Sequence, residues 1–267
     1  MSETSIWNRR TNEKSTFLAS TGVRVGDDSG DSSSPREQQH TLEASWTVWF
    51  LHRGPGMKIS NYLLATKQVR TFSTVEEFWD TYSHLRRVDK LPFTSEFQIF
   101  RKGVKPLWED PINEQGGKWV VRFKRPMKER KKMDGTTTNS SLVLDQQQNT
   151  QRHIQCRQQA ALHWENLLLA ALGGTLADGE IAFDEILGLV ISVRRDEDIL
   201  SVWTRSSDNE DAKEKIRSGI KRVLKLPESF ALDYKVHVQS IKEGAEKQAL
   251  YEQKKAEAAT NPAPTSV

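Results

Sequence analysis

One stretch joins a strand pattern to a loop whose residues suit ligand binding: Phe97-Gln-Ile-Phe-Arg-Lys-Gly-Val-Lys-Pro-Leu-Trp-Glu-Asp110. Phe97–Phe100 alternates as a β-strand does, and the loop ends in Trp108-Glu109. The indole offers a stacking face, and the carboxylate can accept two neighbouring N–H groups. This pair suits a cationic purine such as N7-methylated guanine, through stacking, cation–π attraction and a bidentate hydrogen bond. Taken alone, a Trp-Glu pair in a loop is more often ordinary packing beside a solvated charge.

Other segments repeat the period-two pattern and predict an antiparallel sheet. The clearest is Phe230–Val238, in which every second side chain is apolar and shares one face of the strand. This pattern indicates a sheet that is packed on one side and open on the other. A hairpin is expected at Arg194–Asp198. The remaining predicted strands are Trp46–Leu51, Trp119–Phe123, Leu189–Val193 and Leu200–Trp203.

Three helices are predicted between these strands. Ser73-Thr-Val-Glu76 has the capping-box pattern, and Ser207-Asp-Asn-Glu210 repeats it. Trp164–Leu172 is a strongly apolar third helix that ends at Gly173-Gly174. The predicted fold class is α+β, with one curved antiparallel β-sheet backed by about three helices on its convex face. Its other face is left free for a ligand.

The composition indicates one globular domain with polar tails. A hydrophobic content of 36% in 267 residues is enough for a single core. Residues 1–39 are predicted to be a disordered tail, and residues 244–267 a disordered tail or a frayed helix. The domain between them spans 40–243, and its polar stretch 126–155 is expected to be a loop insertion.

Charge and cysteine content restrict the classes of function. The formal net charge of +3 is far from the basic surplus of a protein that coats nucleic acid, so any nucleic-acid contact should be local. The single cysteine, Cys156, excludes an internal disulfide and fits the cytosol or nucleus. The chain has no long apolar run or signal core, so neither secretion nor a membrane span is expected.

An enzyme is not expected from these residues. The sequence contains no P-loop, no nucleophile elbow and no cysteine-histidine metal set. Glu109-Asp110 is a carboxylate pair, but no histidine or metal cluster completes a hydrolytic site around it. We therefore predict no catalytic residues, no metal and no cofactor.

Several further motifs stand in a characteristic order: Ser45-Trp-Thr-Val-Trp-Phe50, Thr74-Val-Glu-Glu-Phe-Trp79, Pro106-Leu-Trp-Glu-Asp110, Gly116-Gly-Lys-Trp119, Trp164-Glu-Asn-Leu167, Val193-Arg194 and Ile199-Leu-Ser-Val-Trp203. From about His40 to Lys242 the chain resembles the eukaryotic translation initiation factor 4E family, the mRNA 5′ cap-binding proteins. The likeness is closer to the divergent 4E-homologous class. Tyr62 stands where the initiation factor usually has tryptophan, and Ile199 where it has lysine.

The resemblance implies a site for the 7-methylguanosine cap of mRNA. Trp108 and Tyr62 would stack on the base, and Glu109 would accept its N1–H and N2–H groups. Trp203 would abut the N7 methyl group. The triphosphate would be bound by Lys118, Arg194 and Lys242. From the pattern alone, Tyr62 and Trp203 also fit ordinary strand positions, and Lys118 also fits a solvated charge.

The resemblance also implies a groove on the convex face for a helix with a Tyr-x-x-x-x-Leu-hydrophobic motif. Such a helix would come from an initiation-factor scaffold or from repressor-type binding proteins. By helical spacing alone, Trp79 fits the core equally well. The groove residues would be His40, Val75, Trp79, Asn166, Leu169 and Leu172.

Two functions follow from these observations. In the first, the protein is a cytoplasmic monomer, with a nuclear fraction allowed, that binds capped mRNA and acts in initiation or regulation of translation, including its repression. In the second, it is an interaction scaffold of the same fold with weak or lost cap binding. Tyr62, Ile199 and the acidic run Asp196–Asp198 beside Arg194 favour the second.

Overall fold

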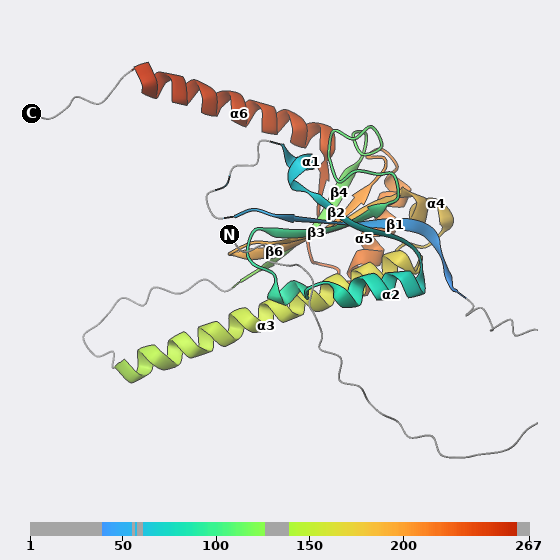
Figure 1. Cartoon of the computed structure of the whole chain (residues 1–267), viewed down its shortest axis with the longest axis horizontal. Coiled ribbons are helices and arrows are strands. Elements are labelled where there is room, and N and C mark those ends of the chain that lie inside the picture. The colour runs from blue at the N-terminus through green and yellow to red at the C-terminus, as the bar shows by residue number, and fades with distance from the viewer. Residues whose placement is uncertain (1–38, 55–56, 58–60, 126–138, 261–267) are drawn as a thin grey trace, which may run out of the picture.

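The computed structural model describes residues 39–54, 57, 61–125 and 139–260. A seven-stranded sheet crosses its centre, and every pair of neighbouring strands is antiparallel (Figure 1). The strand order is β2-β1-β3-β5-β6-β4-β7. The strands are β1 (Thr41–His52), β2 (Lys67–Thr74), β3 (Ser95–Arg101), β4 (Gly117–Lys124), β5 (Ile186–Val193), β6 (Glu197–Thr204) and β7 (Asp233–Val236).

The helices cover the two faces of the sheet unequally. On one side lie α2 (Val75–His84), α3 (Asn139–Leu172) and α5 (Glu210–Leu224) (Figure 1). Of the described helices, α1 (Tyr62–Ala65) and the long α6 (His237–Thr260) lie on the other side. The short α4 (Glu180–Glu185) packs against α5 and β5, and the 3-10 turn Val88–Lys90 packs against α3. The predicted class, a curved antiparallel sheet backed by helices, is confirmed.

Period-two alternation separates the two faces of each central strand. In β3, Phe97 and Ile99 belong to the core under the helices, whereas Glu96 and Gln98 line the open face. The strands β4, β5 and β6 alternate in the same way. The predicted hairpin at Arg194–Asp198 is confirmed, because β5 and β6 pair up to Val193 and Asp198.

Both predicted capping boxes are displaced along the chain. Thr74, and not Ser73, caps α2, and its hydroxyl accepts from the Glu77 amide at 3.2 Å. Asn209, and not Ser207, caps α5 through its side-chain oxygen. The reason is geometric: a capping oxygen reaches only the amides of the first turn, so the residue directly before that turn is selected.

The helix α3 corrects the prediction of a polar loop over 126–155. It begins at Asn139 and continues into the predicted apolar segment Trp164–Leu172 without a break. Its first half, 139–155, contains five glutamines and two leucines, which are good helix formers, and a helix can propagate outward from a packed end without burying an apolar stripe. This half projects from the body of the domain (Figure 1). Residues 126–138 lie outside the described part of the chain.

The last predicted strand is much shorter than expected. It spans only Asp233–Val236, and α6 begins at His237. Val236 pairs with Gly117, the first residue of β4, so the chain beyond has no strand left to pair with. The predicted tail from 244 is helical through Thr260, and residues 261–267, like the tail 1–38, lie outside the described residues. No described helix combines the length and apolarity needed to cross a membrane.

Candidate functional site

A pocket of about 550 Å³ opens on the less covered face of the sheet. Its floor consists of alternate residues of β3, β4, β5 and β6, and its walls come from α1, the loop before β4 and the start of α6. Six of the seven predicted ligand residues line it: Tyr62, Trp108, Glu109, Lys118, Arg194 and Trp203. The fold therefore brings together residues that are up to 141 positions apart, from 62 to 203.

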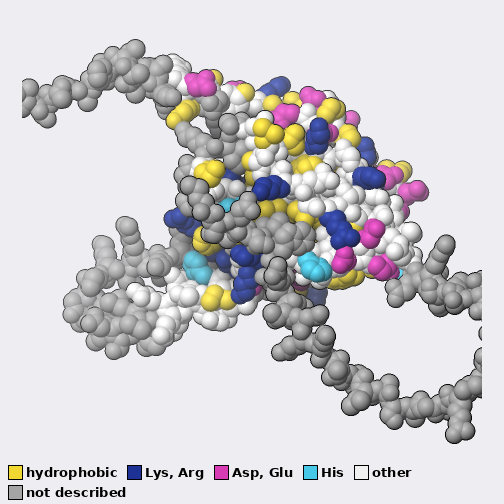
Figure 2. Space-filling model, in the orientation of Figure 1, with side chains coloured by type: hydrophobic (Ala, Val, Ile, Leu, Met, Phe, Trp, Pro, Cys, Tyr) yellow, Lys and Arg dark blue, Asp and Glu magenta, His cyan; other side chains and the backbone are white. Residues whose placement is uncertain are grey.

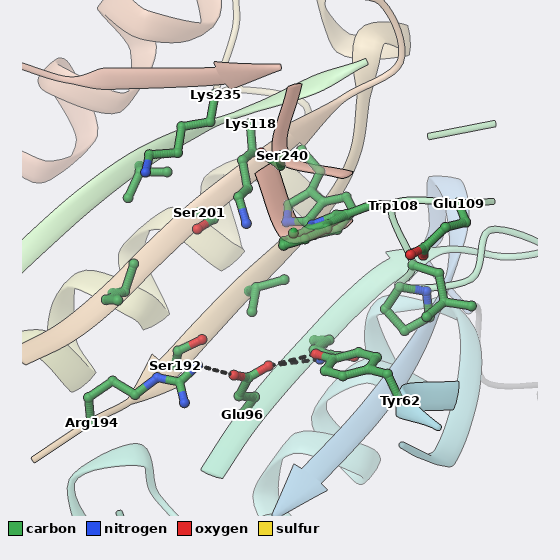
Figure 3. Close-up of a pocket in the computed structure, with 18 of the residues that line it drawn as sticks. Tyr62, Glu96, Trp108, Glu109, Lys118, Ser192, Arg194, Ser201, Lys235 and Ser240 are labelled. Carbon is green, nitrogen blue, oxygen red and sulfur yellow. Dashed lines mark hydrogen bonds and ion pairs between the residues drawn. The ribbon is translucent and has the colours of Figure 1, made fainter. Parts of the chain in front are cut away.

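One end of the pocket is aromatic. Figure 3 shows Trp108, Glu109 and Tyr62 near one another, with Lys118 beside the Trp108 ring. The Trp108 loop is held by Asn113, whose amide group donates to the carbonyls of Lys105 and Leu107 at 2.7 and 2.8 Å. Trp108 is half-buried, and Glu109 is exposed at the mouth of the pocket. This end can present a flat face and a carboxylate to a bound base.

Trp203 fits both interpretations of its position, as a buried strand residue and as a residue of the site. Its side chain is only 5% exposed, and it packs in a small apolar cluster that includes Phe100, yet it also lines the pocket. Its ring centroid lies 4.3 Å from that of His237 at the start of α6. Burial lowers the pKa of His237 to about 4, so the imidazole at this wall is neutral at pH 7.

Lys118 lies between the aromatic and charged ends. Its Nζ atom is 5.0 Å from the ring centroid of Trp108 and 5.2 Å from that of Trp203. Removal from water lowers the pKa of Lys118 to about 8, because burial penalises the ammonium. The prediction that Lys118 belongs to the site agrees with its place in the pocket, and the alternative of a solvated surface charge is wrong.

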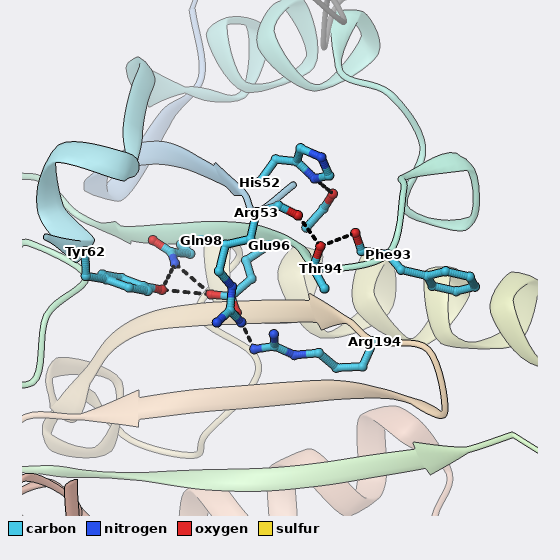
Figure 4. A network of polar contacts seen from close by, with 9 residues as sticks. His52, Arg53, Tyr62, Phe93, Thr94, Glu96, Gln98 and Arg194 are labelled. Atoms are coloured by element: carbon cyan, nitrogen blue, oxygen red, sulfur yellow. Dashed lines mark hydrogen bonds and ion pairs between the residues drawn. The ribbon is translucent and has the colours of Figure 1, made fainter. Parts of the chain in front are cut away.

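A polar network that sequence analysis missed lies across the pocket floor (Figure 4). The Tyr62 hydroxyl donates to Glu96 at 2.8 Å, and Arg194 donates to the other oxygen of the same carboxylate at 2.6 Å. Gln98 donates to both Tyr62 and Glu96. Gln98 lies between Phe97 and Ile99 in the predicted strand and Glu96 directly precedes it, but neither position indicates which residues it contacts.

The other end of the pocket is rich in cations. Besides Arg194, it holds Arg53, Arg122 and Lys235, none of which the sequence motifs indicated. Arg122 forms an ion pair with Glu197 at 2.5 Å, whereas Lys235 has no carboxylate partner among the described residues. On the face drawn in Figure 2, basic and acidic side chains are interspersed. Within the pocket, the cations likewise lie beside acidic side chains, those of Glu96, Glu109 and Glu243.

Lys242 is the predicted residue that the structure does not bring to the pocket. It is exposed on α6, whereas Ser240, Glu243 and Gly244 of that helix line the pocket. Positions 240, 243 and 244 share one helical face, and position 242 is turned away from it. The helix α6, which begins at His237, therefore directs the Lys242 side chain away from the pocket.

Two side chains of the acidic run after Arg194 form ion pairs with other arginines. Asp198 is buried and forms an ion pair with Arg125 at 2.5 Å, while Glu197 faces Arg122. Burial raises the pKa of Asp198, and the Arg125 guanidinium opposes that shift. Arg125 also donates to the carbonyls of Arg194 and Arg195, which fixes the hairpin that presents Arg194.

A second, smaller hollow of about 90 Å³ lies on the helix-covered side. Trp79 and Leu169 line it and are 48% and 42% exposed, so the interpretation of Trp79 as a core residue is wrong.

The other predicted groove residues do not line this hollow. His40 is exposed and binds Glu76. Leu172 was predicted here but is buried in the core, because the helix turns it toward the sheet. Val75 is half-buried, and Asn166 is exposed. The residues that line the hollow and that sequence analysis did not assign to it are Phe78, Tyr82, Glu165 and Leu168.

Comparison with known proteins identifies the family of this chain. The model of the family described as eukaryotic initiation factor 4E matches residues 41–251. The chain belongs to this family. Among initiation factor 4E relatives, the eukaryotic translation initiation factor NCBP of Oryza sativa subsp. japonica is 35% identical, over 77% of this chain and 75% of that protein. The eukaryotic translation initiation factor 4E-4 of Caenorhabditis elegans is 32% identical, over 74% and 77%.

Solved structures of initiation factor 4E proteins have the same fold. C. elegans eIF4E-3 in complex with the 4E-binding protein Mextli aligns with a TM-score of 0.60 and 29% identity, over 76% of this chain and 96% of that chain. Ascaris suum eIF4E-3 in complex with the m7G cap aligns with a TM-score of 0.58 and 28% identity, over 75% and 92%.

Within the described residues, no group of three or more His, Cys, Asp or Glu side chains is arranged to hold a metal ion.

Proposed function

We propose that this protein binds the 7-methylguanosine 5′ cap of mRNA in the large pocket and acts in initiation or regulation of translation. The observation that carries the proposal is the joint placement of Tyr62, Trp108 and Glu109 in one pocket that is cationic at its other end. A methylated guanine needs aromatic faces and a carboxylate, and the attached triphosphate needs cations. The complex of the related Ascaris suum protein with the m7G cap supports the same ligand.

The proposed mode of binding assigns each residue one contact. Trp108 and Tyr62 stack on the two faces of the base, and Glu109 accepts its N1–H and N2–H groups. Trp203, at the back of the pocket, contacts the N7 methyl group. Arg194, Lys118 and Lys235 bind the triphosphate, and Lys235 takes the role that was predicted for Lys242. The positive charge on the methylated base strengthens both the stacking and the contact with Glu109.

Retention on immobilised 7-methylguanosine triphosphate tests this proposal. The wild-type protein should be retained, eluted by free cap analogue and not eluted by GTP. Trp108→Ala should pass through the column. Trp79→Ala is the matched control, because it also removes a tryptophan side chain, but from the opposite side of the sheet. This variant should be retained. Failure of the wild type to bind, or elution by GTP, would favour the scaffold function instead.

We further propose that the hollow beside Trp79 binds a partner helix with a Tyr-x-x-x-x-Leu-hydrophobic motif. The favouring observation is a large exposed indole next to the exposed Leu169, an arrangement in which a partner buries apolar surface. The complex of C. elegans eIF4E-3 with a 4E-binding protein is consistent with such a partner. The partner would then decide whether cap binding leads to initiation or to repression.

A further inference from the structure

Glu96 is the most connected side chain in the pocket. Only 6% of it is exposed, and both of its oxygens are occupied by protein groups. One oxygen accepts from the Tyr62 hydroxyl at 2.8 Å and from Gln98 at 3.1 Å. The other accepts from Arg194 at 2.6 Å and lies 3.9 Å from a nitrogen of Arg53 (Figure 4). Three hydrogen bonds and a nearby guanidinium engage both oxygens, so its role is to hold other groups rather than to bind a ligand.

The contact with Tyr62 fixes an aromatic wall that has little other support. Tyr62 begins α1, which has four residues and no fully buried side chain. The hydroxyl of Tyr62 donates to Glu96 and accepts from Gln98 at 2.6 Å, so both of its hydrogen-bonding roles are used. Burial, and then the neighbouring charge of Glu96, raise the pKa of Tyr62, which keeps the phenol protonated as the donor.

The contact with Arg194 has an electrostatic consequence at the other end of the pocket. The carboxylate cancels one of the positive charges that would attract any triphosphate, whatever base it carries. Glu96 therefore supports the group that recognises the base and weakens the field that recognises phosphate alone. Glu109, at the mouth of the pocket, does not share this role, because no described residue of the pocket floor pairs with it.

We propose that Glu96 is a specificity-determining residue: by anchoring Tyr62 while neutralising Arg194, it makes binding depend on the methylated base rather than on the phosphates. This inference rests on the proposed cap binding. It concerns how the pocket distinguishes 7-methyl-GTP from the uncapped nucleotides that carry the same triphosphate.

The test is Glu96→Gln, which keeps the shape of the side chain and removes its charge. Affinities of wild type and variant for 7-methylguanosine, 7-methyl-GTP and GTP are measured by isothermal titration. Affinity for 7-methylguanosine should fall about three- to tenfold with the loss of a charged hydrogen bond to Tyr62. Affinity for GTP should rise about three- to tenfold with the release of Arg194. The ratio of the 7-methyl-GTP and GTP affinities should then fall about tenfold or more.

Two further variants separate the parts of this effect. Tyr62→Phe keeps the ring and removes the anchor, so it should lower 7-methylguanosine affinity as Glu96→Gln does, and it should not raise GTP affinity, because Arg194 stays paired with Glu96. In the Glu96→Gln background, Tyr62→Phe should have little additional effect, because both changes remove the charged hydrogen bond between these two residues. If Glu96→Gln does not fold, Tyr62→Phe alone decides, since an unchanged affinity for 7-methylguanosine overturns the anchoring role.

The outcomes distinguish the two proposals. If all three ligands lose affinity by the same factor in Glu96→Gln, the residue is structural only and the inference is overturned. It is also overturned if the variant keeps the wild-type preference for 7-methyl-GTP. A wild-type protein that does not prefer 7-methyl-GTP over GTP contradicts cap binding itself, and the inference falls with it.

Discussion

The two faces of the sheet are built from the same strands but have opposite chemistry. On the face under α2, α3 and α5, alternate side chains form a continuous apolar core around Trp46 and Trp164, both fully buried. On the other face, the intervening positions of β3 to β6 carry Glu96, Lys118 and other polar groups around a cavity. A strand sends neighbouring side chains to opposite faces, so one short sequence such as 96–99 specifies both a core and a site.

The helix-covered face is therefore expected to stabilise the fold, and the open face to bind a ligand. Helices cover the first face, and burial of its aromatic residues supports the fold. The second face keeps charges in a partly covered hollow, an arrangement that favours binding and does little for folding. Trp79 is the exception on the helix side, because it points outward from α2. The following predictions test whether each tryptophan behaves as its face requires.

The largest effect is expected from Trp164→Ala. Trp164 is fully buried at the centre of the core, and removal of such a side chain costs about 3–5 kcal/mol of unfolding free energy. Urea unfolding followed by fluorescence would measure the loss. Trp79→Ala is the control, since its exposed ring should change the unfolding free energy by about 1 kcal/mol or less. Equal losses in the two variants would contradict the division between core and groove.

Trp108→Ala and Glu109→Ala should come next, with their effect on ligand binding instead of stability. Loss of a stacking side chain costs about 1–3 kcal/mol per base, so affinity for 7-methyl-GTP should fall by about one to two orders of magnitude. Glu109→Ala should also abolish the preference for guanine, because the base donors lose their charged acceptor. Equilibrium fluorescence titration would measure both. Unchanged affinity in Glu109→Ala would remove this residue from the site.

Trp79→Ala should reduce the binding of a Tyr-x-x-x-x-Leu-hydrophobic peptide by about 2 kcal/mol, the value typical of a tryptophan hot spot. Affinity for 7-methyl-GTP should stay at the wild-type value, because Trp79 lies on the opposite side of the sheet from the pocket. Fluorescence anisotropy with a labelled peptide would measure the loss. A variant that binds the peptide normally would show that the partner docks elsewhere.

Much of the fold could be predicted because it depends on local patterns. Alternation in Phe97–Phe100 and Leu189–Val193 gave the central strands and their faces. The same patterns failed where the outcome depended on distant partners. Strand β7 ends because β4 offers no residue before Gly117 to pair with, a limit that the apolar alternation through Val238 cannot reveal. The polar start of α3 contains five glutamines, which favour a helix, but no apolar stripe, so the search for periodicity missed it.

The candidate site was predicted only where single residues have a distinctive chemistry. Trp108-Glu109 is such a pair, and the structure places it in the pocket. Glu96 and Lys235 were missed because a charged residue on a strand is common and indicates nothing until the other strands are placed beside it. Arg53 was missed because it follows β1 and lies outside any strand. The Tyr62 contact with Glu96 joins positions that are 34 residues apart, and no spacing rule connects them.

The smallest effect expected is a pH dependence that arises at the wall of the pocket. His237 is fully buried against Trp203, and burial lowers its pKa to about 4, below the value of about 6.5 in an unfolded chain. Between these values the unfolded chain binds a proton that the folded protein does not, so stability falls as pH drops through 6.5 and the loss levels off below 4. From pH 7 to pH 5.5 the loss should be about 1 kcal/mol.

His237→Phe isolates this contribution, because phenylalanine keeps an aromatic ring against Trp203 and cannot titrate. Its unfolding free energy at pH 7 should be lower than that of the wild type, since the hydrogen bond between the imidazole and the Asn113 carbonyl, 2.9 Å long, is lost. The wild-type advantage should then shrink by about 1 kcal/mol at pH 5.5, while all other titrating groups cancel in the comparison. An advantage that stays constant from pH 7 to pH 5.5 would mean that water reaches His237, so that its pKa is the same in the folded and the unfolded chain. The back of the pocket would then be open to solvent, unlike the helix-covered face.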